Sequence, residues 1–220
     1  MTIIAEAATV PVARIASKAT LAAIRPTFDL LSRDPYCAGG YRYRAASRFD
    51  CTDGLRPLPR LPLYQSAEYN PIEGYGGIAR HYDDLPAPLL RSSALEVLAA
   101  EWVALIGSPV ATLSVHMIRT RAPGMPVPEG KHRDGNDWVG IYVAARRNIT
   151  EESGVTTVWD RQDRVLLNDV LRPGELASFD DRLTFHDTSP IAAAEAGEPA
   201  WRDVLVFSTP DHAHYLDGGA

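Results

Sequence analysis

The chain has 220 residues, of which 45% are hydrophobic and 23% are charged, and its formal net charge is −6. This is the composition of an ordinary globular protein that is long enough to bury a sizeable core. An acidic chain lacks the broad basic surface that binds phosphate backbones or anionic lipids, so we expect neither nucleic acid nor membrane as a main partner.

The start of the chain and the cysteines predict a cytoplasmic protein. The alanine-rich first residues include Glu6, Arg14 and Lys18 and lack the basic segment of a secretory signal. No apolar run approaches the ~20 residues that span a bilayer. Cys37 and Cys51 have no CxxC spacing, and two cysteines in a chain of this length do not form a disulfide framework. We expect both thiols to be structural.

The first half of the chain predicts helices around a long irregular segment. A helix is expected from about Val12 to Leu31, followed by a strand with alternating polarity at 41–50. Residues 53–77 are rich in Pro and Gly and predict an irregular arm, and loops of this length inside compact domains are usually functional. A second helix is expected at 87–107, with Gly107 as its C-terminal stop.

After Ser108 the sequence changes to short β-type segments separated by turns. This pattern is typical of a sandwich or jelly roll, and the preceding helices would cover one face of its sheet. We therefore expect a mainly β fold with flanking helices in a single domain of residues 1–220. Residues 1–107 would form the helices and the arm, and residues 108–220 the jelly-roll core. The β-type segments are 109–121, 137–147, 153–160, 164–169, 174–181 and 202–210.

A candidate metal site lies in the segment "PEGKHRDGNDWVGIYV" at 128–143. His132 and Asp134 are two residues apart, and such residues point to the same side of an extended chain. A third ligand is offered by His186 in "RLTFHDTSPI". Two histidines and one carboxylate leave several coordination positions free, which is the pattern of non-haem Fe(II) oxygenases.

The H-x-D pattern by itself is a weak signal, and alone it would more often be a polar turn. The chain carries a second copy, His81-Tyr82-Asp83, directly before a predicted helix that Asp83 or Asp84 would cap. The "HRD" letters also occur in protein-kinase catalytic loops. Val139 stands where a kinase has Asn, and neither a Gly-rich phosphate loop nor DFG occurs, so a kinase is excluded.

Arg202 strengthens the metal interpretation because it opens the apolar segment "WRDVLVFSTP". A guanidinium is costly to bury without a partner, but its planar fork holds a carboxylate bidentately. The order His-x-Asp, His, Arg therefore indicates a metal with 2-oxoglutarate. The alternative is a salt bridge between Arg202 and Asp203 or Asp181.

These segments resemble the bacterial 2-oxoglutarate/Fe(II) dioxygenases that hydroxylate free L-amino acids, the L-isoleucine dioxygenase-like group. The resemblance covers most of the chain after the N-terminal helix. It implies a double-stranded β-helix, a cupin-like jelly roll. It also implies that His132, Asp134 and His186 bind Fe(II) and that Arg202 binds 2-oxoglutarate, with O2 as the other co-substrate. The segments that carry it are "YRYRAASRF", "YQSAEYNPIEGYGG", "PEGKHRDGNDWV", "DDRLTFHDTSPI" and "WRDVLVFST".

One departure from the wider superfamily leaves the second contact to 2-oxoglutarate open, since Val204 stands where a Ser is frequent. Arg119, on the preceding strand, is a candidate for a co-substrate or substrate carboxylate, or else a surface charge. Trp138 is a candidate pocket wall, or else a core residue. Tyr69, Asn70 and Arg80 lie in residues 64–80, the end of the arm with the three residues that follow it, and we expect this segment to close over the substrate; the alternative is a static Ω-loop.

The function expected is Fe(II)- and 2-oxoglutarate-dependent hydroxylation of a free L-amino acid or close derivative, with release of succinate and CO2. Two alternatives remain at this point. One is a zinc hydrolase on the same three ligands, with Glu129 or Asp137 as its base, although no HExxH helix is present. The other is a non-catalytic β-barrel protein that binds a small molecule and in which His132 and His186 are merely packed.

Overall fold

The computed structural model describes residues 10–15 and 17–212. Along the chain the elements are β1 (Val12–Arg14), α1 (Lys18–Ile24), the 3₁₀ helix η1 (Arg25–Leu30), β2 (Arg42–Asp50), β3 (Arg56–Pro57), β4 (Leu63–Tyr64), β5 (Ala79–Arg80), α2 (Ala87–Leu90), α3 (Ser93–Ile106), β6 (Thr112–Arg121), β7 (Trp138–Arg147), β8 (Thr156–Asp160), β9 (Val165–Asp169), β10 (Glu175–Asp180), β11 (Thr184–Thr188) and β12 (Trp201–Thr209). Among these described residues, no helix is both long and apolar enough to cross a membrane.

The helix expected from about Val12 to Leu31 starts later, at Lys18, and consists of two helices that end at Leu30. Residues 12–14 form β1, which pairs antiparallel with β10. The α-helix begins only after Ser17, whose hydroxyl accepts a hydrogen bond from the backbone N–H of Thr20 at 3.1 Å. Pro26 has no N–H to continue the α-helical bonding, and the chain continues as η1. The prediction about a secretory signal rests on residues 1–24, of which 1–9 and 16 lie outside the described residues.

A seven-stranded antiparallel sheet forms the centre of the molecule, in the order β1-β10-β7-β12-β6-β2-β3. The strand expected at 41–50 is confirmed as β2, which pairs along its whole length with β6. Strands from the first 107 residues therefore belong to the same sheet as strands that follow Ser108.

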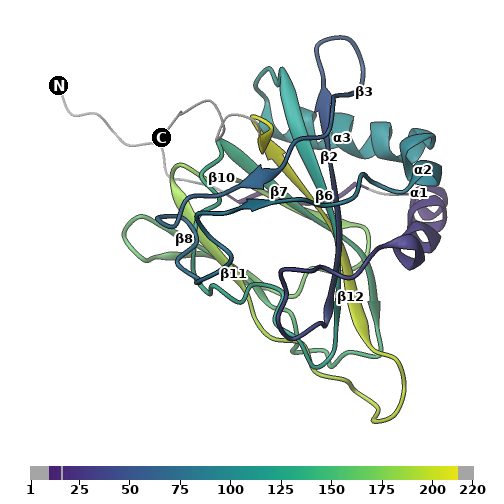
Figure 1. Cartoon of the computed structure of the whole chain (residues 1–220), viewed down its shortest axis with the longest axis vertical. Coiled ribbons are helices and arrows are strands. Elements are labelled where there is room, and N and C mark those ends of the chain that lie inside the picture. The colour runs from purple at the N-terminus through teal and green to yellow at the C-terminus, as the bar shows by residue number, and fades with distance from the viewer. Residues whose placement is uncertain (1–9, 16, 213–220) are drawn as a thin grey trace.

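The large sheet is covered on both faces. α1, α2 and α3 lie on one side of it, and β8 and β11 lie on the other (Figure 1). Because side chains alternate along a strand, β12 contributes Leu205 and Phe207 to the core beneath the helices, while Val204 packs in a second core with Val158 of β8. The smaller sheet has the order β11-β8-β9. This is the two-sheet β architecture with flanking helices that the sequence predicts.

The helix expected at 87–107 is two helices. Ser92 interrupts it by capping α3, since its hydroxyl accepts a bond from the N–H of Ala94 at 3.1 Å. Gly107 ends α3 in the left-handed conformation, with a φ of 67°, as expected. Capping by Asp83 or Asp84 is wrong, because α2 has no side-chain cap. Those carboxylates instead accept bonds from the hydroxyls of Ser32 and Ser47 at 2.8 and 3.2 Å.

One close contact holds α3 against the sheet. Trp102 is fully buried, and its indole N–H donates to the hydroxyl of Ser178 on β10 at 3.1 Å. The indole lies over Gly140 of β7, where an added Cβ would come within 2.4 Å of Trp102 Nε1. Only a glycine lets the helix approach the strand this closely.

We predict that Gly140→Ala lowers the free energy of unfolding by about 1–3 kcal/mol, because the added methyl group overpacks the core. Chemical denaturation of both proteins measures this difference. In a Trp102→Leu background the same substitution should cost clearly less, since the colliding ring is gone. An equal cost in both backgrounds would place the strain elsewhere.

Candidate functional site

The structure brings together the three donors that the sequence singles out. One ligand atom from each of His132, Asp134 and His186 lies within 4.8 Å of the others. The carboxylate of Asp134 lies 3.3 Å from His132 Nε2 and 3.8 Å from His186 Nε2. Asp83 of the second H-x-D pattern is instead bonded to Ser32.

Backbone pairing explains why the two histidines lie side by side. His132, in the loop before β7, and His186, on β11, exchange both of their N–H···O=C bonds, at 3.0 and 2.9 Å. Residues paired in this way project neighbouring side chains, and the two rings are 4.2 Å apart. His132 Nδ1 lies 2.9 Å from the carbonyl of Gly130, so donation to that carbonyl leaves Nε2 as the metal-binding atom.

Asp181 fixes the loop that carries Asp134. Its carboxylate accepts the backbone N–H groups of Asp134, Gly135 and Asn136 at 3.2, 2.7 and 3.0 Å. The Asp181 side chain is fully buried, and burial, followed by the charge of Asp134, raises its pKa to about 7 against these three bonds. The sequence suggests Asp181 only as a partner for Arg202, so this role is a finding of the structure.

The electrostatics of the three donors favour a bound cation. Burial and the neighbouring His132 lower the pKa of His186 to about 3, so its imidazole is neutral. For His132, burial lowers the pKa, but the carboxylates of Asp134 and Glu129 outweigh this and raise it to about 9. In the absence of a metal ion, the two carboxylates therefore stabilise a proton on His132. They would attract a metal ion in the same way, and metal binding would release that proton.

A cavity adjoins these donors, and Arg202 lines it. The Arg202 residue is only 4% exposed, yet its Nε and Nη2 have no hydrogen-bond partner among the residues that the structure describes. Burial, with a contribution from Arg146, lowers its pKa to about 9. The alternative salt bridges of Arg202 are wrong: Asp181 holds the loop described above, and Asp203 pairs with Arg119 at 2.7 Å.

Arg119 and Trp138 do not line this cavity. On β6 the cavity is lined by His116, Ile118 and Thr120, so Arg119 points to the opposite face. There its guanidinium forms ion pairs with Asp203 and Asp29. By the same alternation on β7, Trp138 packs against the core beneath the helices.

The arm forms one wall of the cavity. β4 and β5 pair and close it into a loop, in which Gln65, Tyr75 and Arg80 face the cavity. Asn70 is buried behind this wall and donates to Gln65 and Glu129 at 3.2 and 3.3 Å. Tyr69 is partly exposed and does not line the cavity. Of the three arm residues expected at the site, the structure therefore places Arg80 in the cavity.

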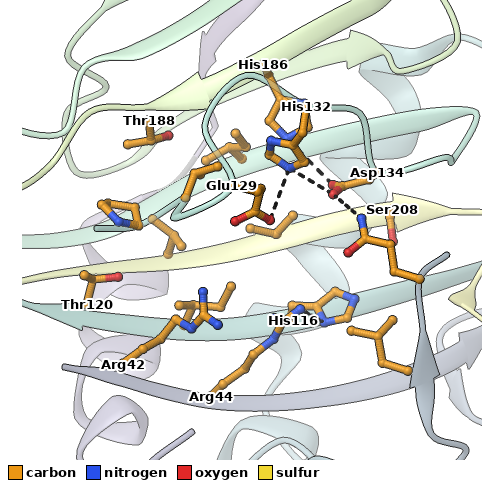
Figure 2. Close-up of a pocket in the computed structure, with 18 of the residues that line it drawn as sticks. Arg42, Arg44, His116, Thr120, Glu129, His132, Asp134, His186, Thr188 and Ser208 are labelled. Atoms are coloured by element: carbon orange, nitrogen blue, oxygen red, sulfur yellow. Dashed lines mark hydrogen bonds and ion pairs between the residues drawn. The ribbon is translucent and has the colours of Figure 1, made fainter. Parts of the chain in front are cut away.

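The cavity also contains charged residues that the sequence does not single out. Arg42 and Arg44 of β2 point into it from the wall opposite His132 and His186 (Figure 2). Arg42 is paired with Asp34 at 2.7 Å, whereas Arg44 contacts His116 Nδ1 at 3.0 Å. The available signal is the alternation in "YRYRAASRF", which puts Arg42 and Arg44 on one face of the strand.

Comparisons with known proteins agree with this geometry. A family model described as "2OG-Fe dioxygenase" matches residues 25–208. No curated protein sequence matches the chain. Among solved structures, the chain is similar to a bsmA homolog from Methylobium petroleophilum PM1, with a TM-score of 0.71 and 23% identity over 88% of this chain and 82% of that one.

Two further structures show the same fold. IDO from Bacillus thuringiensis has a TM-score of 0.68 and 16% identity over 86% of this chain and 85% of its own. The Fe(II)/α-ketoglutarate-dependent dioxygenase TqaL has a TM-score of 0.65 and 19% identity over 88% of this chain and 75% of its own. These similarities confirm the expected double-stranded β-helix. Since the family model spans residues 25–208, which include the three donors and Arg202, the chain belongs to the 2OG-Fe dioxygenase family, which uses Fe(II), 2-oxoglutarate and O2.

Proposed function

We propose that this oxygenase hydroxylates the side chain of a free L-amino acid or close derivative, with release of succinate and CO2. The observation that carries the oxygenase assignment is the unpaired, buried guanidinium of Arg202 in the same cavity as His132, Asp134 and His186. Succinate release with Fe(II) and 2-oxoglutarate, measured across a panel of free L-amino acids, tests the proposal.

Fe(II) would be held by His132, Asp134 and His186. Two imidazoles and one carboxylate suit this metal and leave positions for other ligands. When bound, iron with 2-oxoglutarate and O2 supplies the oxidising power needed for an unactivated C–H bond. The chain contributes the placement of the three donors and a cavity partly lined by Ile118, Ile141 and other apolar side chains.

Arg202 would hold the distal carboxylate of 2-oxoglutarate. Its free Nε and Nη2 are two donors of one planar fork, which suits bidentate binding of a carboxylate. Val204 cannot add a hydrogen bond. Thr120, opposite Arg202 in the register of β6 and β12, and Thr188 of β11 line the same cavity, so their hydroxyls are our candidates for the second contact.

The resemblance of the arm and the metal loop to amino acid hydroxylases supports an amino acid substrate, and so does Arg80 in the cavity. In this proposal Asn70 acts through Gln65 and Glu129, which it holds in place. Contact between Tyr69 and the substrate would require the arm to move, and closure of the arm stays a prediction.

The two alternatives fit the site less well. Glu129 Oε1 lies 3.8 Å from His132 Nε2, which is a suitable place for a hydrolytic base, while Asp137 is exposed and pairs with Arg182. However, neither a zinc hydrolase nor a simple binding protein accounts for both the open ligand set and the buried Arg202. Metal analysis separates the three functions: iron with succinate release is expected, zinc without it indicates a hydrolase, and no metal indicates a binding protein.

We predict that Asp134→Ala abolishes succinate formation while the protein stays folded. Asp134 is the only carboxylate of the three donors, and its loss leaves two imidazoles to hold the metal. Asp83→Ala, in the second H-x-D pattern, should keep most of the activity. Near-normal turnover by a folded Asp134→Ala protein would refute the metal assignment.

Arg202→Ala should weaken 2-oxoglutarate binding and spare the metal. Removing one partner of a desolvated charge pair costs ~2–5 kcal/mol, which corresponds to a loss of roughly 30- to several-thousand-fold in affinity. Calorimetric titration of the metal-loaded protein with 2-oxoglutarate measures this loss of affinity. Arg119→Ala is the matched control on the neighbouring strand and should retain the affinity. If Arg119→Ala lowered the 2-oxoglutarate affinity and Arg202→Ala did not, Arg119 would be the residue that binds the co-substrate.

We expect Asp181→Asn to lower metal affinity about 10- to 100-fold, the usual effect of removing a group that orients a ligand. An asparagine amide would place N–H donors against the backbone N–H groups of residues 134–136. Competition with a chelator of known affinity gives the constant. Asp187→Asn, on the same strand as His186 but outside the cavity lining, is the control, and equal affinities of the two variants would contradict this role.

A further inference from the structure

Arg202 is not the only cavity residue with an unpaired charged group. Nε of Arg44, Nε of Arg80 and Oε2 of Glu129 are all buried and have no hydrogen-bond partner within residues 10–15 and 17–212. All three residues line the same cavity. The metal donors and Arg202 account for Fe(II) and 2-oxoglutarate, so these three groups remain for the substrate.

Arg44 and Arg80 meet at Tyr75. The phenol oxygen of Tyr75 accepts a bond from Arg44 Nη1 at 3.2 Å, and the guanidinium of Arg80 lies over the Tyr75 ring, 4.0 Å from its centroid. Arg80 is 1% exposed and also donates to Gln65 Oε1 at 3.3 Å. The two guanidinium groups thus contact the same aromatic ring in the lining of the cavity.

Neither arginine forms an ion pair among the described residues. No carboxylate there lies within 4.0 Å of Arg44 or Arg80, in contrast to Arg42, which has Asp34. His116, the other neighbour of Arg44, has its pKa lowered well below the usual value by burial and by Arg44, so it stays neutral. Two desolvated cations without a partner are costly unless an anion binds between them. Guanidinium forks suit a carboxylate.

Glu129 supplies the opposite charge. Its side chain is 10% exposed. Oε1 accepts a bond from Asn70 Nδ2 at 3.3 Å, whereas Oε2 has no hydrogen-bond partner in the described part of the chain. Figure 2 shows Glu129 between the histidines and the wall that carries Arg42 and Arg44. An ammonium group would satisfy this carboxylate with a charge-assisted hydrogen bond.

We propose that Arg44 and Arg80 together bind the α-carboxylate of the substrate and that Glu129 binds its α-ammonium group, so that the site selects free α-amino acids over derivatives blocked at either end. This inference rests on the proposed function and specifies how that site recognises its substrate class. If both the α-carboxylate and the α-ammonium group of the amino acid are bound, its side chain is the part that can vary between substrates and that can be oxidised.

Binding calorimetry tests the proposal without turnover. The protein is loaded with Mn(II) in place of Fe(II), saturated with 2-oxoglutarate, and titrated without O2. The ligands are the free L-amino acid that gives the most succinate, its carboxamide, and its N-acetyl derivative. The wild type should bind the free amino acid at least about 30-fold more tightly than either derivative, because each derivative leaves a buried charge unpaired.

The variants assign each end of the substrate. Arg44→Gln and Arg80→Gln should lose discrimination against the carboxamide but keep it against the N-acetyl derivative, and Glu129→Gln should do the reverse. Arg44→Lys and Arg80→Lys retain the charge, and should give intermediate discrimination even where a glutamine variant does not fold. Retained 2-oxoglutarate binding identifies the folded variants. Arg56→Ala, an exposed arginine on β3, is the control that should behave like the wild type.

The failures of this proposal and of the proposed function are distinguishable. If free amino acids bind and yield succinate, but the arginine variants keep full discrimination against the carboxamide, the proposed roles of Arg44 and Arg80 are refuted. The proposed amino acid hydroxylase activity is then unaffected. If the wild type prefers the N-acetyl derivative, Glu129 does not bind an ammonium group. If the protein binds 2-oxoglutarate but no free amino acid, both the proposed recognition by Arg44, Arg80 and Glu129 and the proposed substrate class are refuted.

Discussion

The backbone pairing between His132 and His186 is the constraint on which the site depends. His186 belongs to β11 in the smaller sheet, and His132 precedes β7 in the large sheet. Their two reciprocal hydrogen bonds therefore tie the two sheets together at the point where the metal donors meet. Asp134 lies in the loop before β7, and its position is maintained by the three N–H groups that Asp181 accepts. Burying a carboxylate costs free energy. In the case of Asp181 this cost is offset by hydrogen bonds that order the loop in which the metal ligand Asp134 lies.

The alternation of side chains on β6 and β12 separates two kinds of buried arginine. On the helix side of the sheet, Arg119 and Asp203 neutralise each other at 2.7 Å. One residue away on each strand, Thr120 and Arg202 face the cavity, and there no carboxylate of the described residues pairs with the guanidinium. Both arginines are buried and lie in the same sheet, so burial alone does not mark a ligand site. The difference is the missing counter-charge, which a folded protein tolerates where a ligand supplies it.

The same two arginines show what the sequence could predict. Six of the seven strands after Ser108, the strand at 41–50, the stop at Gly107 and the meeting of His132, Asp134 and His186 follow from local pattern and from resemblance, whereas β11, which carries His186, is not predicted as a strand. The face on which Arg119 points does not follow, because it depends on which side of the sheet the helices cover. The alternation of side chains along a strand shows that Arg119 lies on the face opposite to that of residues 118 and 120, but it does not show which face lines the cavity. The role of Asp181 was hidden for a similar reason, since its partners lie about 45 residues earlier in the chain, beyond the reach of any local spacing rule.

The arm illustrates how position in the fold changes the meaning of a residue. Its tyrosine, asparagine and arginine side chains all suggest substrate contact in the sequence, yet Asn70 is turned inward and orients Gln65 and Glu129. Gly76 makes this packing feasible, because a Cβ there would lie 1.7 Å from the carbonyl oxygen of Asn70. The arm is therefore shaped from inside by its own contacts, and it presents Tyr75 and Arg80 to the cavity. The less the arm moves when a substrate binds, the smaller the entropic cost of binding, and the more interaction energy Arg44 and Arg80 can contribute to affinity and selectivity.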